Sequence, residues 1–197
     1  MIASPEPVAL PRPAGKPTMN GYRLVGIGAF LAAAVILGAF EVFGLTINTT
    51  PSYPRGIWRQ VEVAHPPVIR GRMALACPPR SPAFDEAVRR GYTGGQGSCP
   101  NGYRPIMKRI MAISGDVVTF DGAGGAMQVN GQEIPNSARQ LRDAAGRPMT
   151  PWAGGIIPPG QALMASDYDP YSFDGRYYGP LPEASIYAYT KPVFTIP

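Results

Sequence analysis

The longest apolar run of the chain covers residues 24–40 and contains no charged side chain. After Glu41 the apolar pattern continues to Ile47, so the stretch from Leu24 to Ile47 is 24 residues long. A helix of that length, at about 1.5 Å per residue, measures about 36 Å and can cross a hydrocarbon core of about 30 Å. A core helix of a soluble domain would have a polar face, which this run lacks. The pattern therefore predicts a transmembrane anchor over residues 23–47.

A cleavable signal peptide is the alternative interpretation of this run. The apolar region of such a peptide has about 7–15 residues and ends at small side chains. The run in this chain is longer and ends in the bulky side chains of Phe43, Leu45 and Ile47. We therefore expect an uncleaved signal anchor.

The residues on either side of the anchor indicate its orientation. Residues 1–22 contain five prolines and no apolar period, which is typical of a flexible tail. Cytoplasmic flanks carry more Lys and Arg than exported ones. Basic residues are slightly more numerous before the run, at Arg12, Lys16 and Arg23, than after it, at Arg55 and Arg59. We expect residues 1–22 to form a cytoplasmic tail and residues 48–197 to form a domain on the other side of the membrane.

Beyond the anchor, short apolar or alternating runs are separated by turn residues. Such runs predict strands over residues 57–63, 72–77, 105–114, 117–120, 127–134, 162–166 and 186–190. Within them Asn130–Gly131 is a strong hairpin signal, because both residues tolerate positive φ. Residues 83–90 form the one amphipathic helix candidate. We predict a mostly β domain, either a sandwich or a coiled barrel.

Composition excludes several classes of function. With 45% hydrophobic and 16% charged residues, the chain has too much apolar and too little charged sequence to be disordered, despite 24 Gly and 24 Pro. The net charge is +5, but the basic residues are scattered and form no run longer than two, which argues against nucleic-acid binding. One His and two Cys are too few for a zinc site, and we expect no metal and no cofactor. The single histidine, His65, stands beside Pro66–Pro67 and is interpreted as a loop residue.

Cys77 and Cys99 flank a glycine-rich segment. In an oxidising compartment they can form a disulfide, whereas in a reducing cytosol both remain thiols. An even number of cysteines after a membrane anchor favours the disulfide.

Two residues carry candidate chemistry. Ser52 lies between two prolines, Pro51 and Pro54, that restrict its backbone. Lys108 lies inside the apolar run of residues 105–114, where burial would lower the pKa of its amine. A neutral lysine can take the proton of a serine hydroxyl, so the pair predicts a dyad with Ser52 as nucleophile and Lys108 as general base. The alternatives are a serine in an ordinary turn and a lysine whose amine extends to solvent from a half-buried strand.

Two further segments resemble the bacterial signal peptidase I family. Residues 166–179 match its box GDN-x-x-x-S-x-D-S-R-x-x-G at Asp167, Ser172, Asp174, Arg176 and Gly179. Residues 108–116 resemble its lysine box KR-x-x-x-x-PGD, with Ser114 in place of proline. The serine box of the general family is S-M-x-P-T-L, whereas residues 52–58 read SYPRGIW. This form, together with Cys77 and Cys99 before the lysine box, resembles the conjugative-transfer signal peptidases of the TraF type.

The resemblance implies roles for further residues. Ser172 corresponds to the serine that hydrogen-bonds the lysine amine, and Asp174 with Arg176 corresponds to a structural ion pair behind the site. The oxyanion hole would use the backbone N–H of Ser52 and the hydroxyl of Thr50. The implied fold is a signal-peptidase/LexA-like coiled β-sheet domain behind one N-terminal transmembrane helix.

The implied function is that of a single-pass serine endopeptidase of the bacterial inner membrane with a periplasmic catalytic domain. Ser52 follows Ile47 by five residues, at most about 17 Å of extended chain, so we expect the site to lie near the lipid surface. Residues Ile57 and Trp58 are candidates for contact with that surface, although core packing is the more common position of an Ile and a Trp in a strand. The expected partners are the bilayer and a membrane-tethered precursor, either a pilin of a conjugation apparatus or, as the alternative, any exported preprotein. An inactive membrane-anchored binding module of a secretion or pilus assembly is the alternative from another class.

Overall fold

The computed structural model describes residues 19–62, 64 and 67–196. The chain divides between Val42 and Phe43 into two units, which are described separately. The first unit contains helix α1, Met19–Val42. Its segment Tyr22–Val42 has a mean hydropathy of 2.2 and is long and apolar enough to cross a membrane. An N-terminal signal sequence can have the same length and the same apolar composition.

The helix ends five residues before the predicted end of the anchor at Ile47. Gly44 adopts a φ of +60°, and its carbonyl oxygen accepts a hydrogen bond from Gln60 N at 2.7 Å. Residues Leu45–Asn48 then form strand β1 instead of continuing the helix. An apolar run by itself does not show whether its last residues continue the helix or form a strand. In the structure these residues form a strand because they pair with β2.

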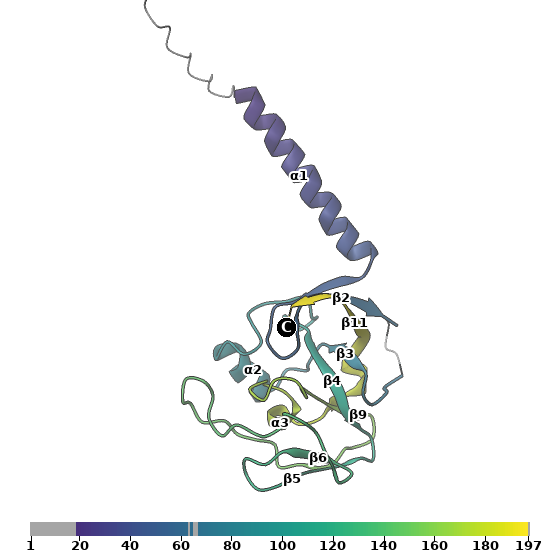
Figure 1. The fold of residues 1–197 in the computed structure, drawn as a ribbon, viewed down its shortest axis with the longest axis vertical. Helices are drawn as coiled ribbons and strands as arrows, with labels where there is room; N and C mark the ends of the chain where they lie inside the picture. Colours follow the sequence, from purple (N-terminus) through teal and green to yellow (C-terminus); the bar gives the residue numbers. More distant parts are fainter. Residues whose placement is uncertain (1–18, 63, 65–66, 197) are drawn as a thin grey trace, which may run out of the picture. The chain divides into compact units, whose positions relative to one another are not determined.

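The larger of the two sheets in the second unit has seven strands, in the order β1-β2-β11-β3-β4-β9-β10. Its other strands are β2 Arg55–Val61, β3 Met73–Ala76, β4 Ile106–Ile113, β9 Gln161–Ala165, β10 Leu181–Pro182 and β11 Ile186–Ile196. All neighbours in it are antiparallel. Figure 1 shows how β11, from the C-terminal end of the chain, lies between β2 and β3, which come from its first half.

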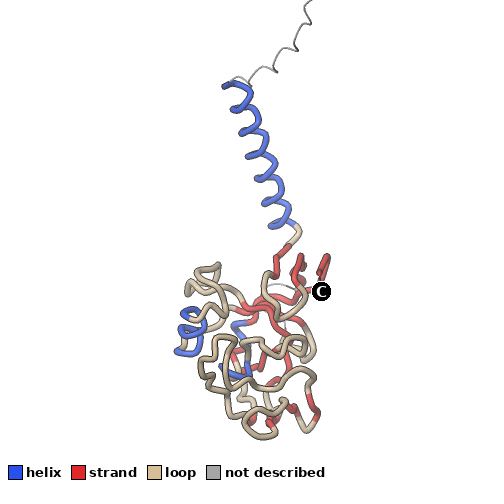
Figure 2. The backbone as a smooth tube through the Cα atoms, turned by 60° about the vertical axis from the view of Figure 1, so that its left-hand side comes forward, coloured by secondary structure: helices blue, strands red, loops and turns tan. Residues whose placement is uncertain are grey.

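A smaller, four-stranded sheet has the order β7-β6-β5-β8. Its strands are β5 Val117–Phe120, β6 Met127–Val129, β7 Gln132–Glu133 and β8 Gly155–Ile156. Asn130 and Gly131 join β6 to β7 with φ values of +51° and +79°, as the hairpin signal predicted. The backbone tube in Figure 2 shows that long loops, drawn in tan, occupy much of the rest of this unit.

Strands β4 and β9 lie between two hydrophobic cores. Ile110 of β4 and Met164 of β9 belong to one core, whereas Ala112 and Leu163 belong to the other. A strand with a core on each side is shielded from water on both faces. This arrangement explains why a lysine in β4 is buried.

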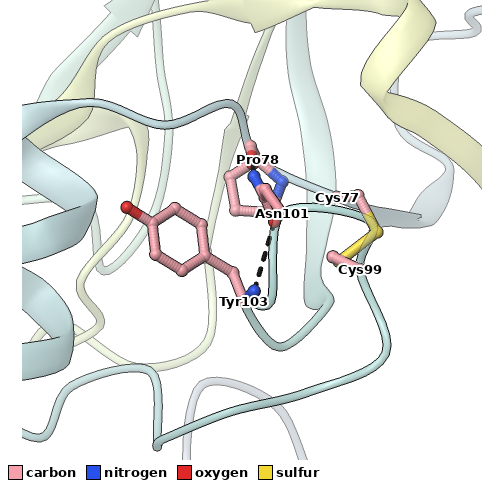
Figure 3. The surroundings of a disulfide bond; sticks show 5 residues. All are labelled: Cys77, Pro78, Cys99, Asn101 and Tyr103. Atoms are coloured by element: carbon pink, nitrogen blue, oxygen red, sulfur yellow. Dashed lines mark hydrogen bonds between the residues drawn. A yellow bond between two sulfur atoms is a disulfide. The ribbon is translucent and has the colours of Figure 1, made fainter.

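Helix α2, Pro82–Arg89, matches the predicted helix. Ser81 caps it, and the helix buries Phe84 and Ala87 against the first core. Beside it Cys77 and Cys99 form a disulfide with a Cα–Cα distance of 5.5 Å, so the predicted pairing is present. Asn101 holds the chain near this disulfide through two hydrogen bonds. Its Oδ1 accepts a bond from the backbone N–H of Tyr103 at 3.2 Å, as Figure 3 shows. Asn101 Nδ2 in turn donates to the carbonyl of Pro78 at 2.7 Å.

The mostly β fold is confirmed, with five elements that the pattern did not predict. These are β1, β8, β10, helix α3, Gly175–Tyr178, and the 3-10 helix η1, Glu183–Ser185. All five have four residues or fewer, so they are too brief to show a period of their own. Strand β11 also extends six residues past the predicted end at Thr190, because β2 supplies a partner along that extension.

Candidate active site

Ser52 lies in the loop between β1 and β2 and is 7% exposed. Its hydroxyl oxygen accepts a hydrogen bond from the hydroxyl of Ser172 at 3.3 Å. Its carbonyl oxygen accepts one from Ser166 Oγ at 2.7 Å. Among the described residues, no group accepts a hydrogen bond from the backbone N–H of Ser52. That N–H is therefore available to a ligand.

Lys108 is the third residue of β4 and is 6% exposed. Desolvation by burial lowers the pKa of its amine to about 8, against the opposing effect of the Asp174 carboxylate. Arg176 acts in the same direction as burial, because a second cation disfavours the ammonium form. At pH 8 about half of such amines are neutral and can accept a proton.

The structure brings the two candidate catalytic residues to the same end of β9. Arg109, the neighbour of Lys108, pairs with Ala165, the last residue of β9, and Ser166 follows Ala165 in the chain. Ser166 holds the Ser52 carbonyl, as described above. The described residues include no hydrogen-bond acceptor for the Lys108 amine, and Ser172 is bonded to Ser52 rather than to that amine. The lysine-orienting role implied for Ser172 remains a prediction.

Asp174 and Arg176 form the expected ion pair, with Nη2 at 2.7 Å from Oδ2. The aspartate also caps α3 by accepting a hydrogen bond from Arg176 N. The guanidinium donates further bonds to the carbonyl oxygens of Asn136, Ala138, Asp169, Pro170 and Ser172. One buried side chain thus ties the segment that carries Ser172 to the loop that contains Asn136 and Ala138.

Asn48 organises the loop that carries Ser52, and the sequence analysis did not single it out. Its Nδ2 lies at 3.0 Å, 2.9 Å and 3.2 Å from the carbonyl oxygens of Thr50, Tyr53 and Pro54. Its Oδ1 accepts bonds from the backbone N–H of Thr50 at 3.1 Å and from the Thr50 hydroxyl at 2.8 Å. The single proton of Thr50 Oγ1 is therefore directed at Asn48, and a role in the oxyanion hole requires that hydroxyl to turn.

Tyr53 anchors the other side of the same loop and was also missed. Its hydroxyl donates to Asp167 Oδ1 at 2.8 Å and lies 3.2 Å from the carbonyl of Ala165. Arg109 Nε lies 3.0 Å from the other Asp167 oxygen. Burial, with the hydrogen bond to Asp167, raises the pKa of Tyr53, so its hydroxyl stays protonated and remains a donor. No sequence signal marks Tyr53, because its partners lie more than a hundred residues away.

The remaining sequence predictions concern Trp58, His65 and the N-terminal tail. Trp58 is 4% exposed and donates to the carbonyl of Pro54 from Nε1, so it packs in the core and does not offer its ring to a lipid surface. His65 lies outside the described residues, as do residues 1–18 of the tail predicted over residues 1–22, whereas residues 19–22 belong to helix α1.

Ser52 and Lys108 are thus both buried, burial lowers the pKa of the Lys108 amine, and the backbone N–H of Ser52 has no acceptor among the described residues. The family model for signal peptidase, peptidase S26, matches residues 20–195. The chain belongs to this family, as the three sequence boxes predicted.

Several proteins with similar sequences are conjugal or plasmid transfer proteins. A probable conjugal transfer protein TraF of Sinorhizobium fredii is 39% identical over 173 residues, which is 87% of this chain and 89% of that protein. The conjugal transfer protein TraF of Agrobacterium fabrum is 35% identical over 174 residues, covering 88% and 94%. A plasmid transfer protein TraF of Escherichia coli is 38% identical over 179 residues, covering 90% and 96%.

A crystal structure of a signal peptidase I from Enterococcus faecalis aligns with 62% of this chain and 97% of its own, at 16% identity and a TM-score of 0.34. The family membership rests on the sequence matches and not on this likeness.

Proposed function

We propose that the chain is a membrane-anchored serine endopeptidase that cleaves a pilin-type precursor at the outer face of the bacterial inner membrane during conjugative transfer. The burial of Lys108 in β4, which lowers the pKa of its amine to about 8, is the observation that carries this proposal. The names of the relatives, which are conjugal or plasmid transfer proteins, support the biological setting.

The chemistry follows from the two side chains. The neutral amine of Lys108 takes the proton of the Ser52 hydroxyl while Oγ forms a bond to the carbon of the scissile carbonyl. The backbone N–H of Ser52 then stabilises the negative charge on the carbonyl oxygen. Lys108 returns its proton to the leaving amine as the C–N bond breaks. Water, deprotonated by the same amine, hydrolyses the ester and frees Ser52.

Three features support the expected location. A disulfide between Cys77 and Cys99 suits a domain outside the cytoplasm. Helix α1 is apolar and long enough to span a membrane, and β1 begins at Leu45, three residues after the helix ends. On one face of the sheet, the register sets Ile47 beside Ile57, and Ile57 beside Phe194. Ile47 and Phe194 are 60% and 64% exposed, so this face is compatible with a lipid surface.

The test is co-expression of the full chain with a candidate pilin precursor and, separately, with an ordinary exported preprotein, followed by mass measurement of each product. Ser52→Ala and Lys108→Ala are each expected to abolish cleavage of the pilin precursor. The matched controls are Ser137→Ala, at a buried serine that makes no hydrogen bond to Ser52, Ser172 or Lys108, and Lys191→Ala, at an exposed lysine. Both controls should cleave normally.

Cleavage by Lys108→Ala at the wild-type rate would overturn the dyad. Cleavage of the exported preprotein in place of the pilin precursor would replace the conjugative role with a housekeeping one. Absence of Ser52-dependent cleavage of either precursor would favour a binding module.

A further inference from the structure

Ser166 follows the last residue of β9 and is completely buried. Its hydroxyl oxygen accepts hydrogen bonds from the backbone N–H groups of Tyr168 at 3.1 Å and Asp169 at 2.9 Å. A serine hydroxyl has one proton and two lone pairs. Because both lone pairs are taken, the proton is directed at the remaining partner, the carbonyl oxygen of Ser52 at 2.7 Å. Every hydrogen-bonding position of this hydroxyl is thus filled.

The backbone of Ser166 is held just as firmly. Its N–H donates to Asp174 Oδ2 at 3.0 Å, and that same oxygen accepts from Arg176 Nη2. A continuous series of bonds therefore runs from the buried ion pair through Ser166 to Ser52. Ser166 also follows Ala165, which pairs with Arg109, the neighbour of Lys108 in β4. Ser166 therefore bonds both the residue of the nucleophile and the ion pair.

The family box quoted above begins with glycine at the position of Ser166. A glycine has no hydroxyl and cannot donate to the Ser52 carbonyl. In this chain the bond is an added constraint on a loop whose other end is held by Asn48. The constraint acts on the peptide group of the nucleophile itself.

We propose that Ser166 is a positioning residue for the nucleophile. By fixing the carbonyl of Ser52, its hydroxyl sets the orientation of the Ser52 side chain, whose oxygen accepts the bond from Ser172. This inference rests on the proposed function, in which Ser52 is the nucleophile. Loss of the hydroxyl leaves the Ser52 carbonyl without its buried partner and lets that residue turn, and small displacements of a reacting atom lower rates strongly.

The experiment compares Ser166→Ala with Ser137→Ala in the full-length protein, using the precursor whose cleavage depends on Ser52. Ser137 is a matched control, because it is also completely buried and its hydroxyl also bonds backbone groups, those of Met127 and Ile134. We expect Ser166→Ala to lower kcat about tenfold with KM changed less than twofold. Ser137→Ala should lower thermal stability to a similar degree and leave kcat within twofold.

Crystal structures of the two variants give a readout that needs no substrate. The separation between the Ser172 and Ser52 hydroxyl oxygens is expected to lengthen in Ser166→Ala and to stay near 3.3 Å in Ser137→Ala. Equal kcat values for both variants, or an unchanged separation in Ser166→Ala, would overturn the positioning role. If Ser52→Ala itself still cleaves the precursor, the proposed function fails, and this outcome is distinct from a failure of Ser166→Ala alone.

Discussion

The side chains of Asp174 and Arg176 form an ion pair from which water is completely excluded, each with no exposed surface. Two charges removed from water attract strongly, but the attraction does little more than offset the cost of their desolvation. The pair therefore specifies the conformation of the segment around Ser172 more than it adds to stability. Because it lies next to Lys108, it also sets the electrostatic surroundings of the candidate base.

Replacing one partner of this pair should be costly. Asp174→Asn leaves the Arg176 charge buried without a counter-charge, which typically lowers the free energy of unfolding by about 3–5 kcal/mol. Urea unfolding of the variant measures this loss. The control is Glu62→Gln, which breaks an exposed ion pair with Arg72 and should change the free energy by less than about 1 kcal/mol. Equal effects of the two substitutions would contradict the structural role of Asp174.

The pH dependence of cleavage should follow the Lys108 amine. Its pKa of about 8 predicts that kcat/KM rises about tenfold per pH unit below that value and levels off above it, because only the neutral amine is a base. In Asp174→Asn the carboxylate that raises the pKa of Lys108 is lost, so the folded variant should show its profile at lower pH. Rate measurements between pH 6 and pH 10, values chosen to bracket a pKa of about 8, test both statements. A profile that stays flat through pH 8 would contradict the assignment of Lys108 as base.

The same burial of Lys108 should lower the free energy of unfolding at neutral pH. The unfolded chain holds this proton with a pKa of about 10.4, whereas the folded protein holds it with a pKa of about 8, which costs about 3 kcal/mol at pH 7. The cost is fully present below pH 8 and disappears as the pH rises from about 8 to about 10.4, since the unfolded state binds more protons in that interval. We therefore expect Lys108→Met to be inactive but more stable than the wild type at pH 7.

Unfolding of both proteins at pH 7 and at pH 10 measures this effect. The stability advantage of Lys108→Met should be largest at pH 7 and should shrink at pH 10. An advantage that is equal at both pH values would indicate that the amine is not desolvated in the folded protein.

The disulfide between Cys77 and Cys99 should contribute measurable stability. It closes a loop with a sequence separation of 22 residues, for which the chain-entropy model gives about 3 kcal/mol. Cys77→Ser combined with Cys99→Ser, or treatment with reductant, should lower the melting temperature, and reductant should have no effect on the double variant. If reductant leaves the wild-type melting temperature unchanged, the bond does not form in the protein.

Local patterns were sufficient where the signal lies within a few neighbouring residues. The Asn130–Gly131 turn, helix α2 and the strands that alternate in sequence were predicted because their causes are local: tolerance of positive φ, capping and periodicity. The short strands β8 and β10 could not be predicted in this way, because they exist only as partners of β5 and β9. The end of α1 could not be predicted locally either, because Leu45–Asn48 leave the apolar run to pair with β2.

For the site, the sequence by itself determined which groups can react: a serine between prolines, a lysine in an apolar strand, and an Asp and Arg two residues apart. Only the tertiary structure decided how those groups are held. The bonds from Ser166 to Ser52 and from Tyr53 to Asp167 each join residues 114 positions apart. Hydrogen bonds depend on distances of about 3 Å and on direction, and such geometry between distant segments arises only when the sheet has formed.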